Sequence, residues 1–386
     1  MEKKRIYLCL HNHRTMIGIG QQVDVIERVF EDSNEYELKK SFTLVPNEFN
    51  LIIEDISLEM VSLMQNMKKN YNQTKFILFI TEYLTFSKFG IQLNTFDLKS
   101  RITQKYIEFL TEKIKFIDLF RQFKRKPENV FSGTGLNFKE KLAGFLEKLI
   151  LSPLFIFHDY DSFVNSIELT RRLIALKKTK KLFDLVISNC LKVNITYSKF
   201  FEKPVTLVPT FIDKSKAFKE RRKIELKKKL SVGCFFSGRL TTYRKKFLKL
   251  LYPINTIYPG SQLLFRYVER VGKFLESDIG EIPFVEIYIK QAKDWPYSSP
   301  MRTLMTIERG YIPLNIGIFE DHEINKCAIE VDKISKDIPF EIFNKITSLS
   351  INDYYEELYK KIDLHNLSQL KLKNQLFIDI NNMGYE

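Results

Sequence analysis

The sequence predicts an α/β protein built from two doubly wound domains that face a cleft. Short, continuously apolar runs alternate with helical stretches over residues 5–213, as in a parallel sheet that is buried on both faces. The same pattern begins again near residue 231, after a strongly basic stretch. The length of 386 residues also fits two domains, because one domain takes roughly 100–200 residues.

The expected strands are the apolar runs bounded by turn residues. In the first domain they are 5–10, 50–53, 76–80, 154–157, 184–187 and 204–208. In the second domain they are 232–236, 255–258, 284–289 and 311–315. Helical spacing of apolar residues predicts helices after the first strand and over 243–252.

The domain boundaries follow from these patterns. We expect an N-terminal domain over 1–213, which holds a helical insert near 101–150. A basic linker over 214–230 then leads to a second domain over 231–352. The C-terminal segment 353–386 is expected to be helical, and its later part is expected to cross back to the first domain.

Composition excludes several classes of protein. With 44% hydrophobic and 28% charged residues, the chain is neither disordered nor a coiled-coil rod. Its four cysteines lie far apart without a CxxC pair, so no disulfide framework or zinc site is expected. The most apolar run, 149–157, is far shorter than the roughly 20 residues of a membrane-spanning helix. The N-terminus lacks the apolar core of a signal peptide, so we expect a cytoplasmic protein.

The net charge of +14 favours anionic partners. Residues 214–230 hold nine basic and two acidic side chains, and residues 101–150 hold eleven basic and six acidic ones. Anionic lipid headgroups, a phosphorylated substrate and nucleic acid are the candidate partners. A solvated helix face without a partner is the alternative.

Two motifs in the second half suit a phosphate-binding site. Residues 236–245 read FSGRLTTYRK, a small turn that leads into a helix start and carries two arginines. Residues 297–314 read YSSPMRTLMTIERGYIPL, in which Pro300 favours a helix start and Gly310 favours its end. Free N–H groups at a helix start and bidentate arginines are suited to a diphosphate.

These two motifs resemble the nucleotide-sugar-binding half of GT-B glycosyltransferases, which are built from two Rossmann-like domains. The resemblance implies that the donor is held by Ser237, Gly238, Arg239, Arg244, Ser298, Ser299 and Arg302. In this family, a glutamate three residues after the arginine at the position of Arg302 usually holds the ribose hydroxyls. This chain has Met305 at that position. Either Glu308 takes that role or the nucleotide is held differently.

The first half carries candidate catalytic residues. Residues 153–162 read PLFIFHDYDS, and the later runs FDLVISN and PVTLVP complete a likeness to the acceptor domain of GT-B enzymes. Some of those enzymes place His or Asp directly after this strand, where it can act as a general base on an acceptor hydroxyl. The resemblance therefore implies catalytic roles for His158 and Asp159. The alternative is a His–Asp pair that only caps the next helix.

Other candidates follow neighbouring strands. Glu82 is a second candidate base or acceptor contact, unless it is a surface group at a helix start. His11, His13 and Gly18 follow the first strand and are expected acceptor contacts. Residues 159–161 also spell the D-x-D metal motif of GT-A enzymes, but the duplicated α/β pattern argues against that single-domain fold. We therefore expect no metal, and no cofactor besides the nucleotide-sugar substrate.

From the resemblance, we expect a glycosyltransferase that moves a sugar from a nucleotide-sugar donor to a hydroxyl of a saccharide or lipid-linked acceptor. Bacterial surface-polysaccharide assembly, with peripheral contact to the inner face of an anionic membrane, is the expected setting. A phage-type DNA glucosyltransferase is the first alternative, and only there is nucleic acid a partner. A non-catalytic, two-lobed binding or scaffold protein is the second.

Overall fold

The computed structural model describes most of the chain outside a long internal segment. The described residues are 3–10, 20–54, 56–87, 90–93, 105–106, 108–109, 160–227, 229–237, 242–251, 264–268, 281–289, 300–317, 323–331, 337–347 and 350–383. The chain divides into two compact units. The larger comprises Met1–Glu54, Met67–Tyr83 and Leu182–Glu386, and the smaller comprises Asp55–Asn66 and Leu84–Lys181.

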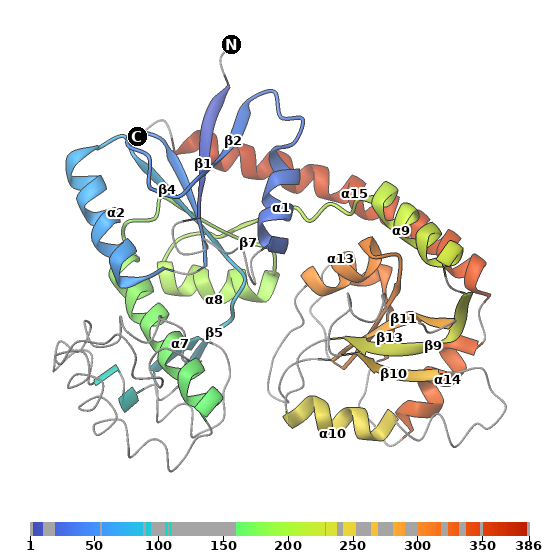
Figure 1. Ribbon diagram of the computed structural model, residues 1–386. Helices are drawn as coiled ribbons and strands as arrows, with labels where there is room; N and C mark the ends of the chain where they lie inside the picture. Colours follow the sequence, from blue (N-terminus) through green and yellow to red (C-terminus); the bar gives the residue numbers. More distant parts are fainter. Residues whose placement is uncertain are drawn as a thin grey trace, which may run out of the picture. The chain divides into compact units, whose positions relative to one another are not determined.

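The larger unit begins with a six-stranded sheet in which every pair of neighbouring strands is parallel (Figure 1). Its strands are β1 (Lys4–Cys9), β2 (Tyr36–Ser41), β3 (Phe49–Ile53), β4 (Lys75–Ile80), β7 (Leu185–Ser188) and β8 (Thr206–Leu207). Their order is β2-β1-β3-β4-β7-β8. The strands β3, β4 and β7 are almost wholly buried, as their apolar sequences predict. The helices α1 (Gly20–Phe30) and α8 (Leu191–Phe201) belong to this part of the chain.

A second, five-stranded parallel sheet follows in the same unit. Its strands are β9 (Lys229–Ser237), β10 (Leu264–Val268), β11 (Glu281–Ile289), β12 (Ile312–Ile316) and β13 (Ile329–Val331). Their order is β10-β9-β11-β12-β13. The helix α13 (Pro300–Glu308) packs on β11 and β12. The helices α10 (Thr242–Leu251) and α14 (Ile338–Thr347) pack against each other on the opposite side of the sheet (Figure 1). A short 3-10 helix, η2 (Glu323–Cys327), precedes β13.

The basic segment expected as a linker is a helix, α9 (Lys214–Lys227). Ala217 and Ile224 are buried because they lie seven residues apart on one side of it. The guanidinium of Arg221 lies 3.8 Å from the ring centroid of Tyr355, on the last helix of the chain. The apolar residues of this segment show no periodicity that would signal a packed helix in the sequence, and in the structure two of them are buried where α9 lies against α13.

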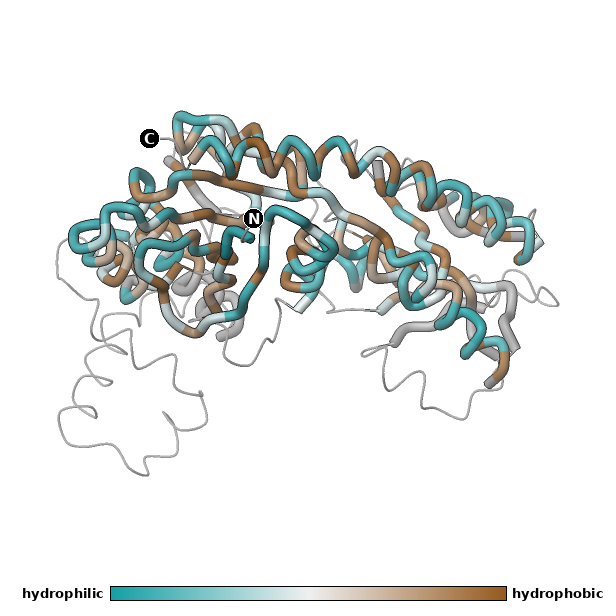
Figure 2. The backbone as a smooth tube through the Cα atoms, turned by 90° about the horizontal axis from the view of Figure 1, so that it is seen from above, coloured by the Kyte–Doolittle hydropathy of each residue, from teal (hydrophilic) through white to brown (hydrophobic). Residues whose placement is uncertain are grey.

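The chain ends in one helix of 32 residues, α15 (Ile351–Asn382), whose N-cap Ser350 accepts a hydrogen bond from the Asp353 amide. This helix contacts η2 and returns to β8 of the first sheet. Near its end, the Asn381 amide oxygen accepts a 2.7 Å hydrogen bond from the Tyr36 hydroxyl. Figure 2 shows hydrophobic and hydrophilic residues alternating along this helix, which runs to the C label. The later part of α15 therefore contacts the first sheet.

The smaller unit contains an antiparallel hairpin of β5 (Leu84–Ser87) and β6 (Gly90–Leu93), which the sequence pattern did not indicate. The helix α7 (Tyr160–Thr179) contacts β6. The helix α2 (Leu58–Asn70) spans the division between the units. Burial would raise the pKa of Glu108, but its ion pairs with Lys177 and Lys105 outweigh that effect and lower it.

The predicted fold class is confirmed, because both sheets are parallel and carry α/β connections. The predicted strands at 154–157 and 255–258 and nearly all of the helical insert at 101–150 lie outside the described residues. In the described part of the chain, no helix combines the length and the apolar character needed to cross a bilayer.

Candidate functional site

The order of the second sheet creates a point where the strand sequence reverses. From β9 the chain moves to β10 on one side and then to β11 on the other side of β9. Ligands of parallel α/β sheets bind at the carboxyl ends of the strands at such a reversal. In this sheet those ends are Ser237 of β9 and Ile289 of β11.

Two arginines contact these strand ends. Arg302, the third residue of α13, donates a 3.1 Å hydrogen bond from Nη1 to the carbonyl of Ser237. Arg244, the third residue of α10, donates to the carbonyl of Ile289 from Nε at 3.0 Å and from Nη2 at 2.8 Å. Ser237, Arg244 and Arg302, three of the residues predicted to bind the donor, therefore lie together at one end of the sheet.

The electrostatics of this end favour an anion. Burial lowers the pKa of Arg244 to about 10, and the neighbouring charge of Arg302 lowers it as well. Arg302 is half-buried and lies 5.5 Å from the ring centroid of Tyr288, whereas Arg244 is fully buried. Arg302 also lies in the first turn of α13, where helix N–H groups and the helix dipole attract negative charge. An anion at this point would relieve the repulsion between the two guanidinium groups.

A buried carboxylate behind this site was missed by the sequence analysis. Glu286, in the middle of β11, accepts hydrogen bonds from the Ser237 hydroxyl and, at 2.7 Å, from the Thr306 hydroxyl. Its Oε2 also accepts a 2.6 Å hydrogen bond from Arg309 Nη2. The signal in the sequence was an acidic residue inside an otherwise apolar run, FVEIYI. Glu286 therefore ties the end of β9 to α13.

Glu308 lies apart from this cluster, at the last position of α13. Both of its carboxylate oxygens pair with the guanidinium of Arg28 on α1, and Oε2 lies 3.3 Å from Lys216 Nζ. It also accepts a 3.1 Å hydrogen bond from the Asp213 amide. Burial alone would lower the pKa of Arg28, but the hydrogen bond and charge of Glu308 outweigh burial and raise it. The carboxylate of Glu308 is thus engaged by α1 and α9, and its role at the nucleotide stays a prediction.

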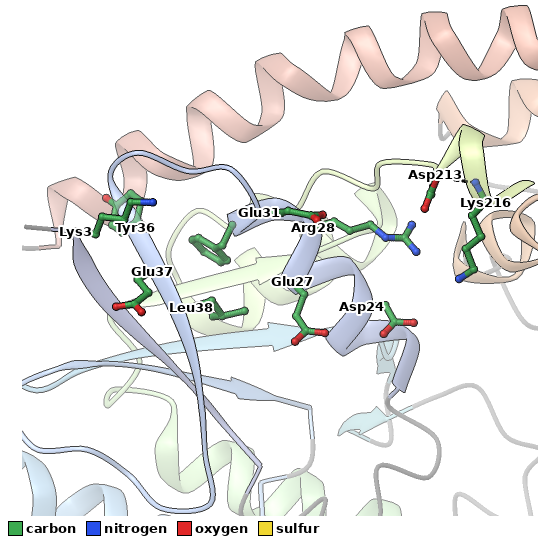
Figure 3. A pocket seen from close by; sticks show the side chains of 11 residues that line it. Lys3, Asp24, Glu27, Arg28, Glu31, Tyr36, Glu37, Leu38, Asp213 and Lys216 are labelled. Carbon is green, nitrogen blue, oxygen red and sulfur yellow. Dashed lines mark hydrogen bonds between the residues drawn. The ribbon is translucent and has the colours of Figure 1, made fainter.

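A pocket of about 610 Å³ lies beside this ion pair, between α1, β2 and the start of α9. Figure 3 shows Arg28 extending from α1 towards Asp213 and Lys216. The other lining residues are Lys3, Asp24, Glu27, Phe30, Glu31, Tyr36, Glu37 and Leu38. Among the described residues, none of the predicted site residues lines this pocket, so we assign it no part in the candidate site.

The first sheet has the same reversal, between β1 and β3. Glu54, directly after β3, accepts a 2.7 Å hydrogen bond from the amide of Thr81 and has a positive φ of 39°. Glu82 follows in the turn after β4 and is half-buried. Two carboxylates therefore lie near the carboxyl ends of neighbouring strands, only one of which the sequence analysis singled out.

Asn189, directly after β7, lies at the same edge of the first sheet. Its side chain is buried, and within the described residues neither its amide oxygen nor its amide nitrogen has a hydrogen-bond partner. Because buried amides are normally paired, we add this side chain to the candidate polar groups at the strand ends. The sequence offered no signal for it beyond its place after an apolar run.

Many predicted site residues fall outside the described residues and stay predictions. They are the donor candidates Gly238, Arg239, Ser298 and Ser299, the catalytic candidates His158 and Asp159, and the acceptor candidates His11, His13 and Gly18. In the part that is described, no three His, Cys, Asp or Glu side chains converge to form a metal site.

No protein-family model and no curated protein sequence matches the chain. Among solved structures, it is similar to the N-terminal domain of Candida albicans trehalose-6-phosphate phosphatase, at 9% identity over 99% of each chain with a TM-score of 0.43. It is also similar to a structure described as trehalose-6-phosphate from E. coli bound with UDP-2-fluoro glucose, at 9% identity over 99% of each chain with a TM-score of 0.42. A UDP-forming α,α-trehalose-phosphate synthase from Burkholderia xenovorans matches at 9% identity over 100% of each chain with a TM-score of 0.41.

At these identities and TM-scores, neither the fold nor the activity of this chain is inferred from the similarities. The strand orders and parallel pairings of the chain itself carry the architectural conclusion. The protein has two Rossmann-like parallel sheets, and at the point of reversal of the second sheet the half-buried Arg302 and the fully buried Arg244 contact the strand ends.

Proposed function

We propose that the protein is a nucleotide-sugar-dependent glycosyltransferase of the GT-B type. The observation that carries the proposal is the convergence of Arg244 and Arg302 on the carboxyl ends of β9 and β11. Cationic side chains at a helix start and a strand reversal suit the diphosphate of a nucleotide donor. The sequence resemblance of the two motifs that contain these arginines supports the same class of ligand.

The reaction assigned to this site is transfer of a sugar to a hydroxyl group. The acceptor oxygen forms a bond to the anomeric carbon, the bond from that carbon to the diphosphate oxygen breaks, and the nucleoside diphosphate leaves. The hydroxyl proton passes to a base, for which Asp159, His158 and Glu82 are the candidates. Arg302 and the start of α13 stabilise the negative charge that develops on the leaving diphosphate.

The acceptor is proposed to be a saccharide or lipid-linked saccharide of a bacterial surface glycan. This part of the proposal rests on the sequence resemblance alone. The carboxylates and the amide near the strand ends of the first sheet, Glu54, Glu82 and Asn189, are groups that could bind sugar hydroxyls. The proposed setting is the cytoplasm.

The donor site is tested by measuring the binding and hydrolysis of UDP-, GDP- and CMP-sugars, with Arg302→Ala as the main variant. Loss of a charge-assisted hydrogen bond to the diphosphate should weaken donor binding by about 1.5–3 kcal/mol in calorimetry. Arg222→Ala, which removes an exposed guanidinium on α9, is the control and should bind normally. Unchanged donor affinity in Arg302→Ala would contradict the site. Arg244 is unsuited to this test because it is fully buried, so its loss would disturb folding.

The base is tested by a separate set of variants. Asp159→Asn and His158→Ala are each expected to lower turnover about a hundredfold or more, the size of a general-base effect. Donor affinity should change little, because the base acts on the acceptor. Loss of turnover in Asp159→Asn alone would indicate a carboxylate base and an inverting reaction. Normal turnover in both, together with an inactive Glu82→Gln, would move the base to the turn after β4.

A further inference from the structure

The solvent side of α15 carries large apolar side chains that the fold leaves uncovered. Leu364 is 69% exposed and Leu367 is 64% exposed, and Leu370 and Ile378 are exposed as well. Leu358, Ile362 and Leu376 are buried on the opposite side of the same helix. The exposed leucines recur at a spacing of three residues, so they form a stripe along one side.

The helix α9 runs antiparallel beside α15. Lys214 pairs with Asp363 at 2.5 Å, the rings of Phe218 and Tyr359 lie 6.0 Å apart, and Arg221 stacks on Tyr355. The exposed side of α9 adds two further apolar side chains, Phe218 and the 86% exposed Leu226. Between them lie the exposed cations Lys219, Arg222 and Lys223. We call the exposed residues of these two helices the α9/α15 face.

The charge of this face is positive. The helix α9 holds seven lysines and arginines against two glutamates, and both glutamates are paired, Glu220 with Lys223 and Glu225 with Arg221. Around the leucine stripe, Lys360 and Lys371 are exposed. The acidic Asp363 is paired with Lys214. The other exposed acidic side chains, Asp353, Glu356 and Glu357, lie nearer the start of α15, and Glu357 is paired with Lys361.

We propose that the α9/α15 face docks on the surface of an anionic lipid bilayer. Cations near such a surface are attracted to its phosphates, while leucine and phenylalanine side chains enter the boundary between headgroups and acyl chains. Duplex nucleic acid would also attract the cations, but it offers nothing to the exposed leucines. The combination of the two kinds of side chain on adjoining helices is what favours a membrane. The inference does not depend on the chemistry proposed for the strand ends.

The test is co-sedimentation of the full chain with vesicles of phosphatidylcholine, with and without about one-third phosphatidylglycerol. We expect binding to the anionic vesicles, weakened by salt, and little binding to pure phosphatidylcholine. Lys219→Glu with Arg222→Glu should lower the partition coefficient at least about tenfold, because each cation near the surface contributes about 1 kcal/mol. Leu364→Gln with Leu367→Gln should lower it roughly fivefold or more through lost apolar insertion.

The matched control is Lys246→Glu with Lys249→Glu, which reverses two exposed charges on α10. It should bind almost as the unmodified chain does, and all variants should keep the far-UV circular dichroism of the folded protein. Absence of binding to anionic vesicles would overturn the proposal, and so would equal loss in the α10 control. An unchanged partition coefficient in the Leu364→Gln, Leu367→Gln variant would mean that charge alone drives binding, and it would contradict the proposed apolar insertion. If the chain forms a dimer that the leucine variant dissociates, the face is a dimer interface and the proposal is contradicted. Binding to duplex DNA without binding to vesicles would contradict the proposal as well.

Discussion

Glu286 is placed where a parallel strand buried on both faces would ordinarily carry an apolar residue. Its two oxygens accept from Ser237, Thr306 and Arg309, so the cost of burying the charge is offset by three donors. One of these donors ends β9 and two belong to α13 and the turn that follows it. The position of Arg302 on α13 therefore depends on a carboxylate that contacts no proposed ligand.

Replacing that carboxylate by an amide of the same size should show how much its negative charge contributes to stability. Glu286→Gln keeps the size of the side chain but loses an acceptor and the ion pair with Arg309. We expect a loss of about 1.5–3 kcal/mol in the free energy of unfolding, the range for hydrogen bonds to charged groups. Chemical denaturation measures it, with the exposed Glu330→Gln as a control expected to change stability by less than about 0.5 kcal/mol. Equal stability of the two variants would show that the cluster contributes no net stability.

The junction of α13 and β12 is closed by a glycine that two other elements approach. Gly310 has a φ of 82°, and the amides of Gly310 and Tyr311 donate to the carbonyls of Ile307 and Thr306, as in a Schellman motif. The Tyr355 hydroxyl of α15 donates a 2.6 Å hydrogen bond to the Gly310 carbonyl. A Cβ on this residue would lie 2.8 Å from Cα of Arg221 and closer still to its nitrogen. The backbone of α9 thus packs directly against this turn.

Gly310→Ala should therefore be strongly destabilising. It combines a positive φ with a clash against backbone, so we expect a loss of more than about 2 kcal/mol in the free energy of unfolding. Gly20→Ala is the matched control, because Gly20 begins α1 and its added Cβ would meet no atom of the described residues within 4 Å. The control should be neutral or up to about 1 kcal/mol more stable. Urea titrations of both proteins give the comparison, and a neutral Gly310→Ala would show that α9 can move away from the turn.

Within the larger unit, contacts between distant parts of the chain join the two sheets. The ion pair of Arg28 with Glu308 links α1 to α13, and α15 contacts both η2 and β8. The later part of α15 contacts β8, and Phe377 of α15 stacks on Phe30 of α1 at 5.7 Å between ring centroids. These contacts predict that the larger unit unfolds as one cooperative structure.

Leu376→Ala tests this cooperativity. Leu376 is fully buried on α15, so the cavity left by its truncation should cost about 2–5 kcal/mol. Leu367→Ala, on the exposed side of the same helix, should cost less than about 0.5 kcal/mol. We expect far-UV circular dichroism and the fluorescence of Trp295, which follows β11 in the sequence, to shift to the same midpoint. Separate midpoints would mean that the two sheets unfold independently.

The sequence by itself determined the class of fold and several of its elements. The apolar runs of β3, β4, β7 and β12 could be recognised because a strand buried on both faces is mostly apolar, although Asn50 in β3 and Asn315 in β12 are buried as well. Pro300 and Gly310 predicted the limits of α13 because a helix start and a helix end each impose local backbone geometry. Local motifs also identified Ser237, Arg244 and Arg302, which the structure brings together.

Only the tertiary structure decided what the other charged residues contact. Glu308 faces Arg28, which is 280 residues away in the sequence, and Glu286 faces donors from two separate segments, the end of β9 and the end of α13. It also decided that the basic stretch 214–227 is a packed helix, because Ala217 and Ile224 are buried, α9 contacts α13 and Arg221 stacks on Tyr355 of α15. Periodicity and turn residues report on neighbours along the chain. The partner of a buried charge is set by which elements meet in space, and that information is spread over the whole sequence.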